Sequence, residues 1–141
     1  MPTRAQLSKS AEYEEGHTEL MRAALEGQTE TVKKLLESGA DVNERDDEGR
    51  TALMFAVTNM HTDTGKALLE HGADVNVKAN DGSTALILAA SSGDSEIVRD
   101  LLSKGADVSA KFTATGKTAL MLAKEKGHTD IIQLLEAGGA K

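Results

Sequence analysis

The sequence has no cysteine and no tryptophan, and it has only one proline, one tyrosine and two phenylalanines among its 141 residues. The absence of cysteine excludes disulfide bonds and thiolate zinc sites. The shortage of aromatic side chains disfavours a sandwich or barrel with bulky contents, whereas the abundant leucine, alanine, valine, isoleucine and methionine favour helices packed closely in layers. A chain of this length fits one domain.

A transmembrane segment and a secretory signal are also missing from the sequence. No stretch approaches the roughly 20 apolar residues that span a bilayer. Residues 1–16 have neither a basic start nor an uninterrupted apolar run. We therefore expect a cytoplasmic protein that does not engage membranes.

The charge is negative and uneven. The net charge is −7, which disfavours unspecific binding to phosphate backbones because that mode depends on Lys and Arg displacing counterions. Residues 1–70 contain 8 Lys or Arg against 14 Asp or Glu, whereas residues 71–141 contain 8 against 9. We expect no nucleic-acid partner, and a front half that is clearly more acidic than the rear half.

Two short phrases recur along the chain at a fixed period. A Gly-x-Thr phrase ends at four threonines that are 33, 33 and 34 residues apart, namely Thr18, Thr51, Thr84 and Thr118. A Gly-Ala-Asp-Val phrase keeps the same period and starts at Gly39, Gly72 and Gly105. A fixed period of this size indicates stacked copies of one helical unit.

The copy that follows Thr84 is the most regular one. Thr84 is placed to cap a helix with its hydroxyl, and Gly93 is placed to end that helix after little more than two turns. A second helix is expected from about Glu96 to Gly105, with apolar residues recurring on one face. The polar stretch that follows predicts a hairpin finger leading to the next unit.

These phrases resemble the ankyrin repeat, which combines Gly-x-Thr-Pro-Leu-His with Ala-Ala-x-x-Gly-His, Ile-Val-x-x-Leu-Leu and Gly-Ala-Asp-Val-Asn. The resemblance implies an all-α solenoid of stacked helix-turn-helix units with hairpin fingers. It covers four repeats at about 13–45, 46–78, 79–112 and 113–141, and leaves residues 1–12 as an N-terminal extension. The resemblance also implies that Asn43 and Asn76 brace the fingers. Hydroxylation of this asparagine, known in animal members, stays open.

The sequence departs from the family pattern in several places. The family's histidine after leucine is replaced by apolar residues that we expect to pack between repeats, namely Met21, Met54, Ile87 and Met121. A flexible methionine strip open to a partner is the alternative. The family's proline at the first helical position is absent from all four repeats. At the two ends, polar residues replace apolar ones and predict solvent-facing caps, namely Glu19, Arg22 and Glu136.

Repeat two departs most. Met60 stands where the other repeats have glycine, and Gly65 stands where the others have Val32, Val98 or Ile132. A glycine inside a helix costs about 1 kcal/mol relative to alanine, and the missing valine side chain removes about 1.5 to 3 kcal/mol of burial. We predict that the second helix of repeat two unfolds first and has the fastest hydrogen exchange.

The sequence offers no convincing catalytic or metal site. His61 and His128 occupy equivalent positions two repeats apart, roughly 20 Å in such a stack, which is too far to share a metal. The acidic run from Glu44 to Glu48 lacks the order of ligands of a calcium loop. No phosphate-binding loop, dinucleotide fingerprint or serine elbow is present. We expect no enzyme activity, no metal and no cofactor.

The resemblance implies that a partner protein binds in a concave groove lined by the fingers and by the exposed ends of the first helices. The residues expected to face the partner are Asp47, Glu48, Arg50, Thr58, Asn59, Asn80, Asp81, Ser83, Ser91, Ser92, Phe112, Thr115, Lys117, Glu125 and Lys126. The fingers run from acidic through neutral to basic, which suits a partner of the reverse pattern. Alternatively, this charge pattern is ordinary surface charge that keeps the protein in solution and selects no partner. Phe112 either anchors the partner or folds under its own finger.

The function expected from the sequence is therefore non-catalytic protein binding by a monomer. An inhibitory or regulatory subunit that covers an enzyme is one alternative, and a structural or engineered scaffold without a native ligand is another. An enzyme that uses the groove as its active site is the least favoured. Residues peculiar to single repeats, such as Met60 and Gly65, favour a natural sequence over an engineered one.

Overall fold

The computed structural model describes residues 17–141. The extension predicted for residues 1–12 and the start of the repeat domain at residue 13 lie outside the described residues. So do Glu14 and Glu15, which the repeat phasing assigns to a first finger.

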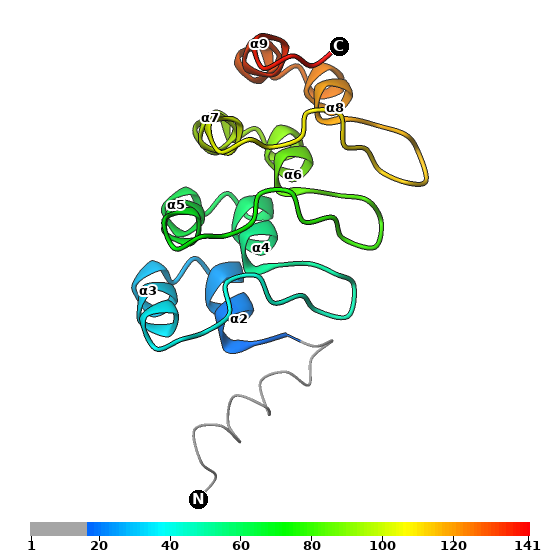
Figure 1. The fold of residues 1–141 in the computed structure, drawn as a ribbon. Coiled ribbons are helices and arrows are strands. Elements are labelled where there is room, and N and C mark those ends of the chain that lie inside the picture. Colours follow the sequence, from blue (N-terminus) through cyan, green and yellow to red (C-terminus); the bar gives the residue numbers. More distant parts are fainter. Residues whose placement is uncertain (1–16) are drawn as a thin grey trace, which may run out of the picture.

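The described chain is all-α and forms four pairs of antiparallel helices that stack in sequence order (Figure 1). The first, inner helices are α2 (Glu19–Leu25), α4 (Ala52–Thr58), α6 (Ala85–Ser92) and α8 (Ala119–Lys126). The second, outer helices are α3 (Thr29–Glu37), α5 (Thr62–Glu70), α7 (Ser95–Ser103) and α9 (Thr129–Ala137). The predicted architecture is confirmed.

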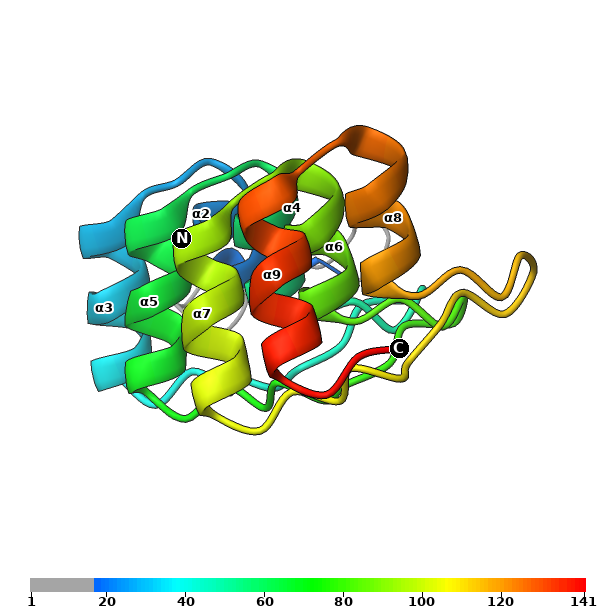
Figure 2. The ribbon, with the colours of Figure 1, turned by 90° about the horizontal axis from the view of Figure 1, so that it is seen from above.

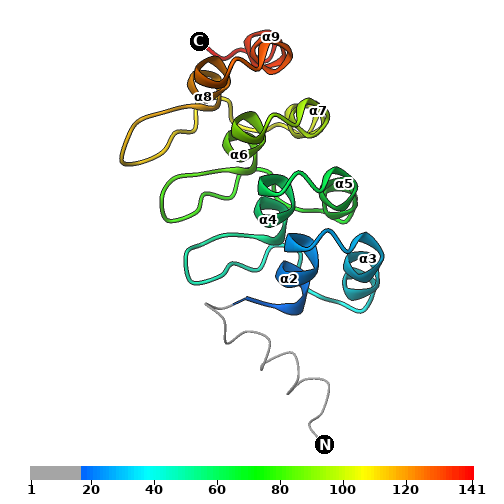
Figure 3. The same ribbon diagram turned by 180° about the vertical axis from the view of Figure 1, so that it is seen from behind.

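Each layer packs against its neighbours in the stack. Inner helices contact inner helices of adjacent repeats, outer helices contact outer helices, and the two helices of a pair contact each other. The view from behind shows the same two columns of helices with the loops projecting from the inner column (Figure 3). Seen from above, the fingers project from one edge of the stack, and the loops that join paired helices lie along another edge (Figure 2). We call this second edge the turn edge; it comprises residues 26–28, 59–61, 93–94 and 127–128.

The four threonines of the repeated phrase start the inner helices as predicted. The side-chain oxygen of Thr18 accepts a hydrogen bond of 3.2 Å from the backbone nitrogen of Met21. Thr51, Thr84 and Thr118 accept the equivalent bonds at 3.3 to 3.4 Å. Each threonine has extended backbone, so the chain enters the helix with one of its otherwise unpaired amides satisfied.

Left-handed backbone ends the inner helices at the turn edge. Gly27, Gly93 and Gly127 have φ of 73°, 92° and 71°. Met60 takes the same conformation with φ of 57°, and it is the only described residue other than glycine with positive φ. The Cβ of such a residue lies close to its own carbonyl oxygen, which costs roughly 1–2 kcal/mol.

At two of these positions, a side chain of the next repeat leaves no room for a Cβ atom, so glycine is required for steric reasons as well. A Cβ on Gly27 would lie 2.5 Å from the ring of His61, and one on Gly93 would lie 2.9 Å from the ring of His128. The residue at the corresponding place beside Met60 is Asp94, which is shorter. A side chain is therefore tolerated at position 60, although its backbone is still strained.

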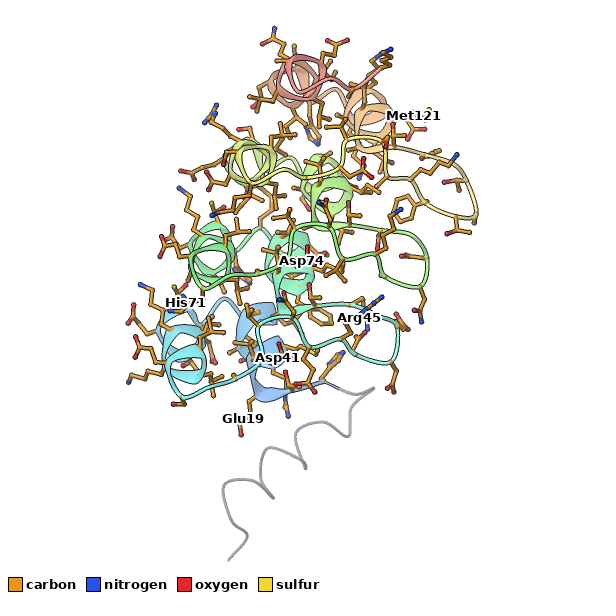
Figure 4. The ribbon with its side chains drawn as sticks, in the orientation of Figure 1. Glu19, Asp41, Arg45, His71, Asp74 and Met121 are labelled. Atoms are coloured by element: carbon orange, nitrogen blue, oxygen red, sulfur yellow. The ribbon has the colours of Figure 1, made fainter. Side chains whose placement is uncertain are left out.

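The apolar row that replaces the family's histidine packs between repeats in three of four copies. Met21, Met54 and Ile87 are buried, as predicted. For Met121 the prediction is wrong, because its side chain is 47% exposed and no further helix pair lies over α8 in the described chain (Figure 4).

The polar residues that were expected at the two ends face solvent. Arg22 and Glu136 are exposed, and Glu19 is half-buried. The end repeats therefore present polar side chains where inner repeats bury apolar ones, which keeps the outer faces of a stack soluble.

The glycine in the second helix of repeat two does not leave a hole. Gly65 is buried, and an added Cβ would lie only 3.0 Å from Cδ1 of Ile97 in the next repeat. The interpretation of the missing valine as lost burial is corrected here, because Ile97 fills the space that a larger residue at position 65 would need. The expected early unfolding of α5 stays a prediction.

Candidate functional site

The described chain has three hairpin fingers, at residues 44–50, 77–83 and 110–117, and they stand beside the inner helices (Figure 1). We number them two, three and four after the repeats that they open. Each finger is closed by an equivalent backbone hydrogen bond, from Asp46 to Arg50, from Ala79 to Ser83 and from Phe112 to Lys117, at 2.9 to 3.0 Å. A glycine that donates its amide back across the turn then completes each hairpin. The three fingers are therefore ordered loops that share one pattern of backbone hydrogen bonds.

Neighbouring fingers are also bonded to each other. The backbone nitrogen of Asn80 donates to the carbonyl of Glu48 at 2.8 Å, and its side-chain amide donates to the carbonyl of Asp47 at 3.2 Å. The backbone nitrogen of Thr113 donates to the carbonyl of Asp81 at 2.9 Å. These bonds hold the finger tips at fixed spacing.

Arg45 links fingers two and three through its guanidinium. Its Nε donates to the carbonyl of Gly49 in its own finger at 3.2 Å, and its Nη2 donates to the carbonyl of Lys78 in the next finger. Figure 4 shows Arg45 at this level of the stack. The guanidinium of Arg45 thus joins two fingers through hydrogen bonds to their carbonyl groups. Repeat phasing alone could not have identified this role, because no other finger has an arginine at the same position.

A buried carboxylate orders the base of finger two. Asp46 accepts hydrogen bonds from Nε of Arg50 at 2.8 Å and from the backbone nitrogens of Glu48 and Arg50 at 3.0 and 2.8 Å. Nε2 of His17 lies 3.3 Å from the same carboxylate. Burial alone would raise the pKa of Asp46, but the hydrogen bonds and the charge of Arg50 outweigh it and lower the pKa.

Phe55 of α4 also belongs to this cluster, because it contacts both Arg50 and His17. The guanidinium carbon of Arg50 lies 4.9 Å from the centre of the Phe55 ring, which is a cation–π distance. The His17 ring meets the same phenylalanine edge to face with the ring centres 5.0 Å apart. Arg50 is therefore held by a carboxylate and a ring, and its main role is to shape finger two.

The predicted partner-facing residues fall into three groups by exposure. The exposed group comprises Asp47, Glu48, Thr58, Asn59, Asn80, Asp81, Thr115, Glu125 and Lys126. The half-buried group comprises Arg50, Ser91, Ser92, Phe112 and Lys117. Ser83 is only 4% exposed, so its side chain does not belong to an exposed surface.

Several of these side chains bond within the stack. The Ser83 hydroxyl donates to Asp81 at 2.7 Å. Burial alone would raise the pKa of Asp81, but this bond and the backbone amide of Ser83 outweigh it and lower the pKa. The Asn59 amide donates to the carbonyl of Leu25 in repeat one at 2.9 Å, and the Ser92 hydroxyl donates to the carbonyl of Leu88 at 2.8 Å.

Phe112 packs partly against the core. It occupies the finger position of Asp46 and Ala79, which are both buried, so the backbone directs this side chain inward. Of the two interpretations left open by the sequence, folding under its own finger accounts for this placement.

The charges at the fingers are partly paired. Nζ of Lys117 lies 2.7 Å from Oε1 of Glu125, and Nη1 of Arg50 lies 3.3 Å from Oε2 of Glu48. Asp47 at the front and Lys111 and Lys126 at the rear are exposed. The fingers therefore present acidic side chains first and basic side chains last.

Neither a metal centre nor a membrane-spanning helix is found in the described part of the chain. Among residues 17–141, no three His, Asp or Glu side chains gather closely enough to hold a metal ion. None of the helices in this range is both long enough and apolar enough to cross a bilayer. His61 instead contacts the carbonyl of Leu25 through Nε2 at 3.1 Å, which is a contact between repeats.

Comparison with known protein families gives a match. The family model described as "Ankyrin repeats (3 copies)" matches residues 20–112 and, in a second overlapping placement, residues 77–141. No curated protein matches the chain. The two placements together cover residues 20–141, which contain all eight helices of the described residues except the first residue of α2.

Proposed function

Since the chain belongs to the ankyrin repeat family, whose members generally bind proteins and are typically non-catalytic, we propose that it binds a partner protein through the groove between its fingers and inner helices. The proposed contact residues are the exposed ones at the finger tips and at the ends of the inner helices. They comprise Asp47, Glu48, Thr58, Asn80, Asp81, Thr115, Glu125 and Lys126.

The bonding between fingers is the observation that supports this proposal most. Asn80 and Arg45 join fingers two and three, and Thr113 joins finger four to finger three. A surface whose loops are already ordered loses little conformational entropy when a partner binds, so more of the contact energy appears as affinity.

The charge along this surface changes from acidic at the front of the stack to basic at the rear. Asp47 and Glu48 lie at the front, and Lys111 and Lys126 lie at the rear. A partner segment that is basic at one end and acidic at the other would lie across the fingers in one orientation, because like charges would oppose the reverse orientation.

A capture experiment with charge-reversed fingers tests the proposal. The wild-type chain, the Asp47→Lys/Glu48→Lys variant and a Glu37→Lys/Glu70→Lys control would each be immobilised and exposed to extract from cells that express the protein. The control makes the same charge change at exposed residues of the outer helices. We expect at least one protein to bind the wild type and the control but not the finger variant.

The captured protein would then be purified and its affinity measured by calorimetry. Equal affinity for the wild type and the finger variant would contradict binding through the fingers. If the captured protein is an enzyme and its activity falls when the chain is added, the chain acts as an inhibitory subunit. If the chain is instead a scaffold without a native ligand, no protein will be captured in a way that depends on the finger residues.

A further inference from the structure

Met60 combines two features that the fold does not need. Its backbone is left-handed, and its side chain is 50% exposed. The other three repeats have glycine at this position, which adopts the same backbone without strain. Met60 therefore adds strain to the folded chain and obtains little packing in return.

A second exposed apolar residue lies at the same repeat boundary as Met60. Leu25, the last residue of α2, is 37% exposed. Its carbonyl accepts hydrogen bonds from the side chains of Asn59 at 2.9 Å and His61 at 3.1 Å, the two residues that flank Met60 in the chain. These bonds tie the backbone of Leu25, where α2 ends at the turn edge, to the segment that carries Met60.

Repeat phasing shows that this pair is peculiar to the front of the stack. The positions equivalent to Leu25 are occupied by Thr58, Ser91 and Glu125, which are all polar. At the later repeat boundaries, the turn edge therefore presents polar side chains or glycine where the front boundary presents leucine and methionine.

The surroundings of the pair have an excess of negative charge. The charged residues in the first turns of α3 and α5, the outer helices that follow the pair in the chain, are acidic, namely Glu30 and Asp63. Glu26 follows Leu25 directly and is exposed, and Asp63 is exposed in the first turn of α5. Three cations lie near these acids. Arg22 shares a surface hollow with Glu26, and Lys33 lies 3.6 Å from Glu30. Lys66 shares a hollow with Asp63 but pairs with Glu96 of the next repeat at 2.7 Å. The charge that complements this surface is positive.

We propose that Leu25 and Met60 form an apolar anchor site for a partner segment that is basic and has one apolar side chain. This inference rests on the proposed function and adds the chemistry of the partner. The apolar side chain of the partner covers Leu25 and Met60, and basic residues on either side of it face Glu26 and Asp63. The strain at Met60 is then retained because its side chain contributes to binding.

Methionine methyl signals in NMR spectra give a direct test, because Met121 is a matched internal control. Met60 and Met121 are similarly exposed, at 50% and 47%, but Met121 lies at the rear of the stack. The probes are synthetic 12-residue peptides rich in Lys and Arg with one central Phe, Leu or Met. A matched peptide has Ala at the centre, and another has Glu in place of the basic residues around a central Phe.

We expect the basic peptides with an apolar centre to shift the Met60 methyl signal on titration and to leave the Met121 signal in place. The peptide with central Ala should bind at least about fivefold more weakly, and the acidic peptide should not shift Met60. The Met60→Gly variant should bind the best basic peptide about tenfold more weakly, measured from backbone amide shifts, and should melt at a higher temperature than the wild type. The Met121→Ala variant should keep the wild-type affinity.

The outcomes separate this inference from the proposed function. If the peptides shift the amide signals of Asp47 and Glu48 but not the Met60 methyl, the anchor site is wrong and binding through the fingers is supported. If the acidic peptide shifts Met60, or if no basic peptide shifts it, the named partner chemistry is wrong. The capture experiment with charge-reversed fingers decides the proposed function independently.

Discussion

The side-chain oxygen of Asn43 lies 2.7 Å from the backbone nitrogen of Asp74, one repeat further along the chain. Asn76 makes the same contact with the backbone nitrogen of Asp107 at 2.8 Å, and its amide also donates to the carbonyl of Gly105 at 3.1 Å. Figure 4 shows Asp41 and Asp74 at successive levels of the stack, where these segments leave the outer helices. Asn43 and Asn76 therefore brace successive repeats through their side chains, at the segments that follow the outer helices and precede the fingers, rather than within the fingers themselves.

Replacing Asn76 by alanine should destabilise the stack by about 1–2 kcal/mol, because two hydrogen bonds between repeats are lost at a site that water reaches. Urea unfolding followed by circular dichroism measures this change. Asn43→Ala removes one bond between repeats and should cost less than Asn76→Ala. Equal losses for the two variants would show that the additional bond to Gly105 has no effect on stability.

Replacing Met60 by glycine should stabilise the fold by about 0.5–1 kcal/mol. The left-handed strain is relieved, and the greater freedom of glycine in the unfolded chain offsets part of the gain. The control is Met121→Gly, which places glycine inside helix α8 and should cost about 1 kcal/mol. Thermal unfolding of both variants provides the measurement, and a destabilised Met60→Gly variant would contradict the strain argument.

Replacing Gly65 by valine, the residue found at this position in repeats one and three, should destabilise the protein by about 1–3 kcal/mol. The new side chain would overlap with Ile97, whose Cδ1 lies 3.0 Å from the position of the added Cβ. Combining Gly65→Val with Ile97→Val makes room, so the double variant should recover part of the loss. Chemical unfolding of the two single variants and the double variant gives the coupling energy. A stable Gly65→Val variant would support the interpretation from sequence alone.

Acid should weaken the fold partly through Asp46. The pKa of Asp46 in the folded protein is lowered below its ordinary value of 3.8, so the unfolded state takes up protons first as the pH falls. The stabilisation is therefore complete above about pH 5 and is lost as the pH falls through the ordinary pKa of 3.8 towards the folded pKa. We expect Asp46→Asn to be less stable than the wild type at pH 7 and to have a flatter stability profile between pH 5 and pH 3, within the usual titration range of carboxylates.

Asp47→Asn is the control for the acid experiment. The carboxylate of Asp47 is exposed and has no hydrogen-bond or ion-pair partner among the described residues. This variant should keep the wild-type profile in urea titrations at several pH values. If both variants changed the profile equally, the hydrogen bonds to Asp46 would not be its cause.

The repeat architecture could be predicted from the sequence because its signals are local. Thr84 caps α6 and Gly93 ends it, and each acts through its own backbone and its near neighbours. The spacing of the threonines then places equivalent helices one above another. Local residue type and period were sufficient to predict the stacked pairs.

The remaining features depend on which side chain of a neighbouring repeat fills a given space. Gly65 leaves no unfilled space because Ile97 of the next repeat lies beside it. Met121 is the same residue type as Met54, but it is exposed because no repeat lies over it in the described chain. The roles of Arg45 and Asn80 depend on carbonyl groups of other fingers. A single sequence gives the type of each residue but not these contacts across the stack.

Contacts between successive layers, together with the almost constant spacing of the threonines, have a consequence for the history of the gene. Recombination that removed or duplicated one whole unit of 33 residues would join equivalent surfaces and still encode a continuous array. Loss of a few codons within a helix would rotate every later side chain of that helix away from its neighbours. Variation in length among descendants of this gene should therefore occur mainly in whole units.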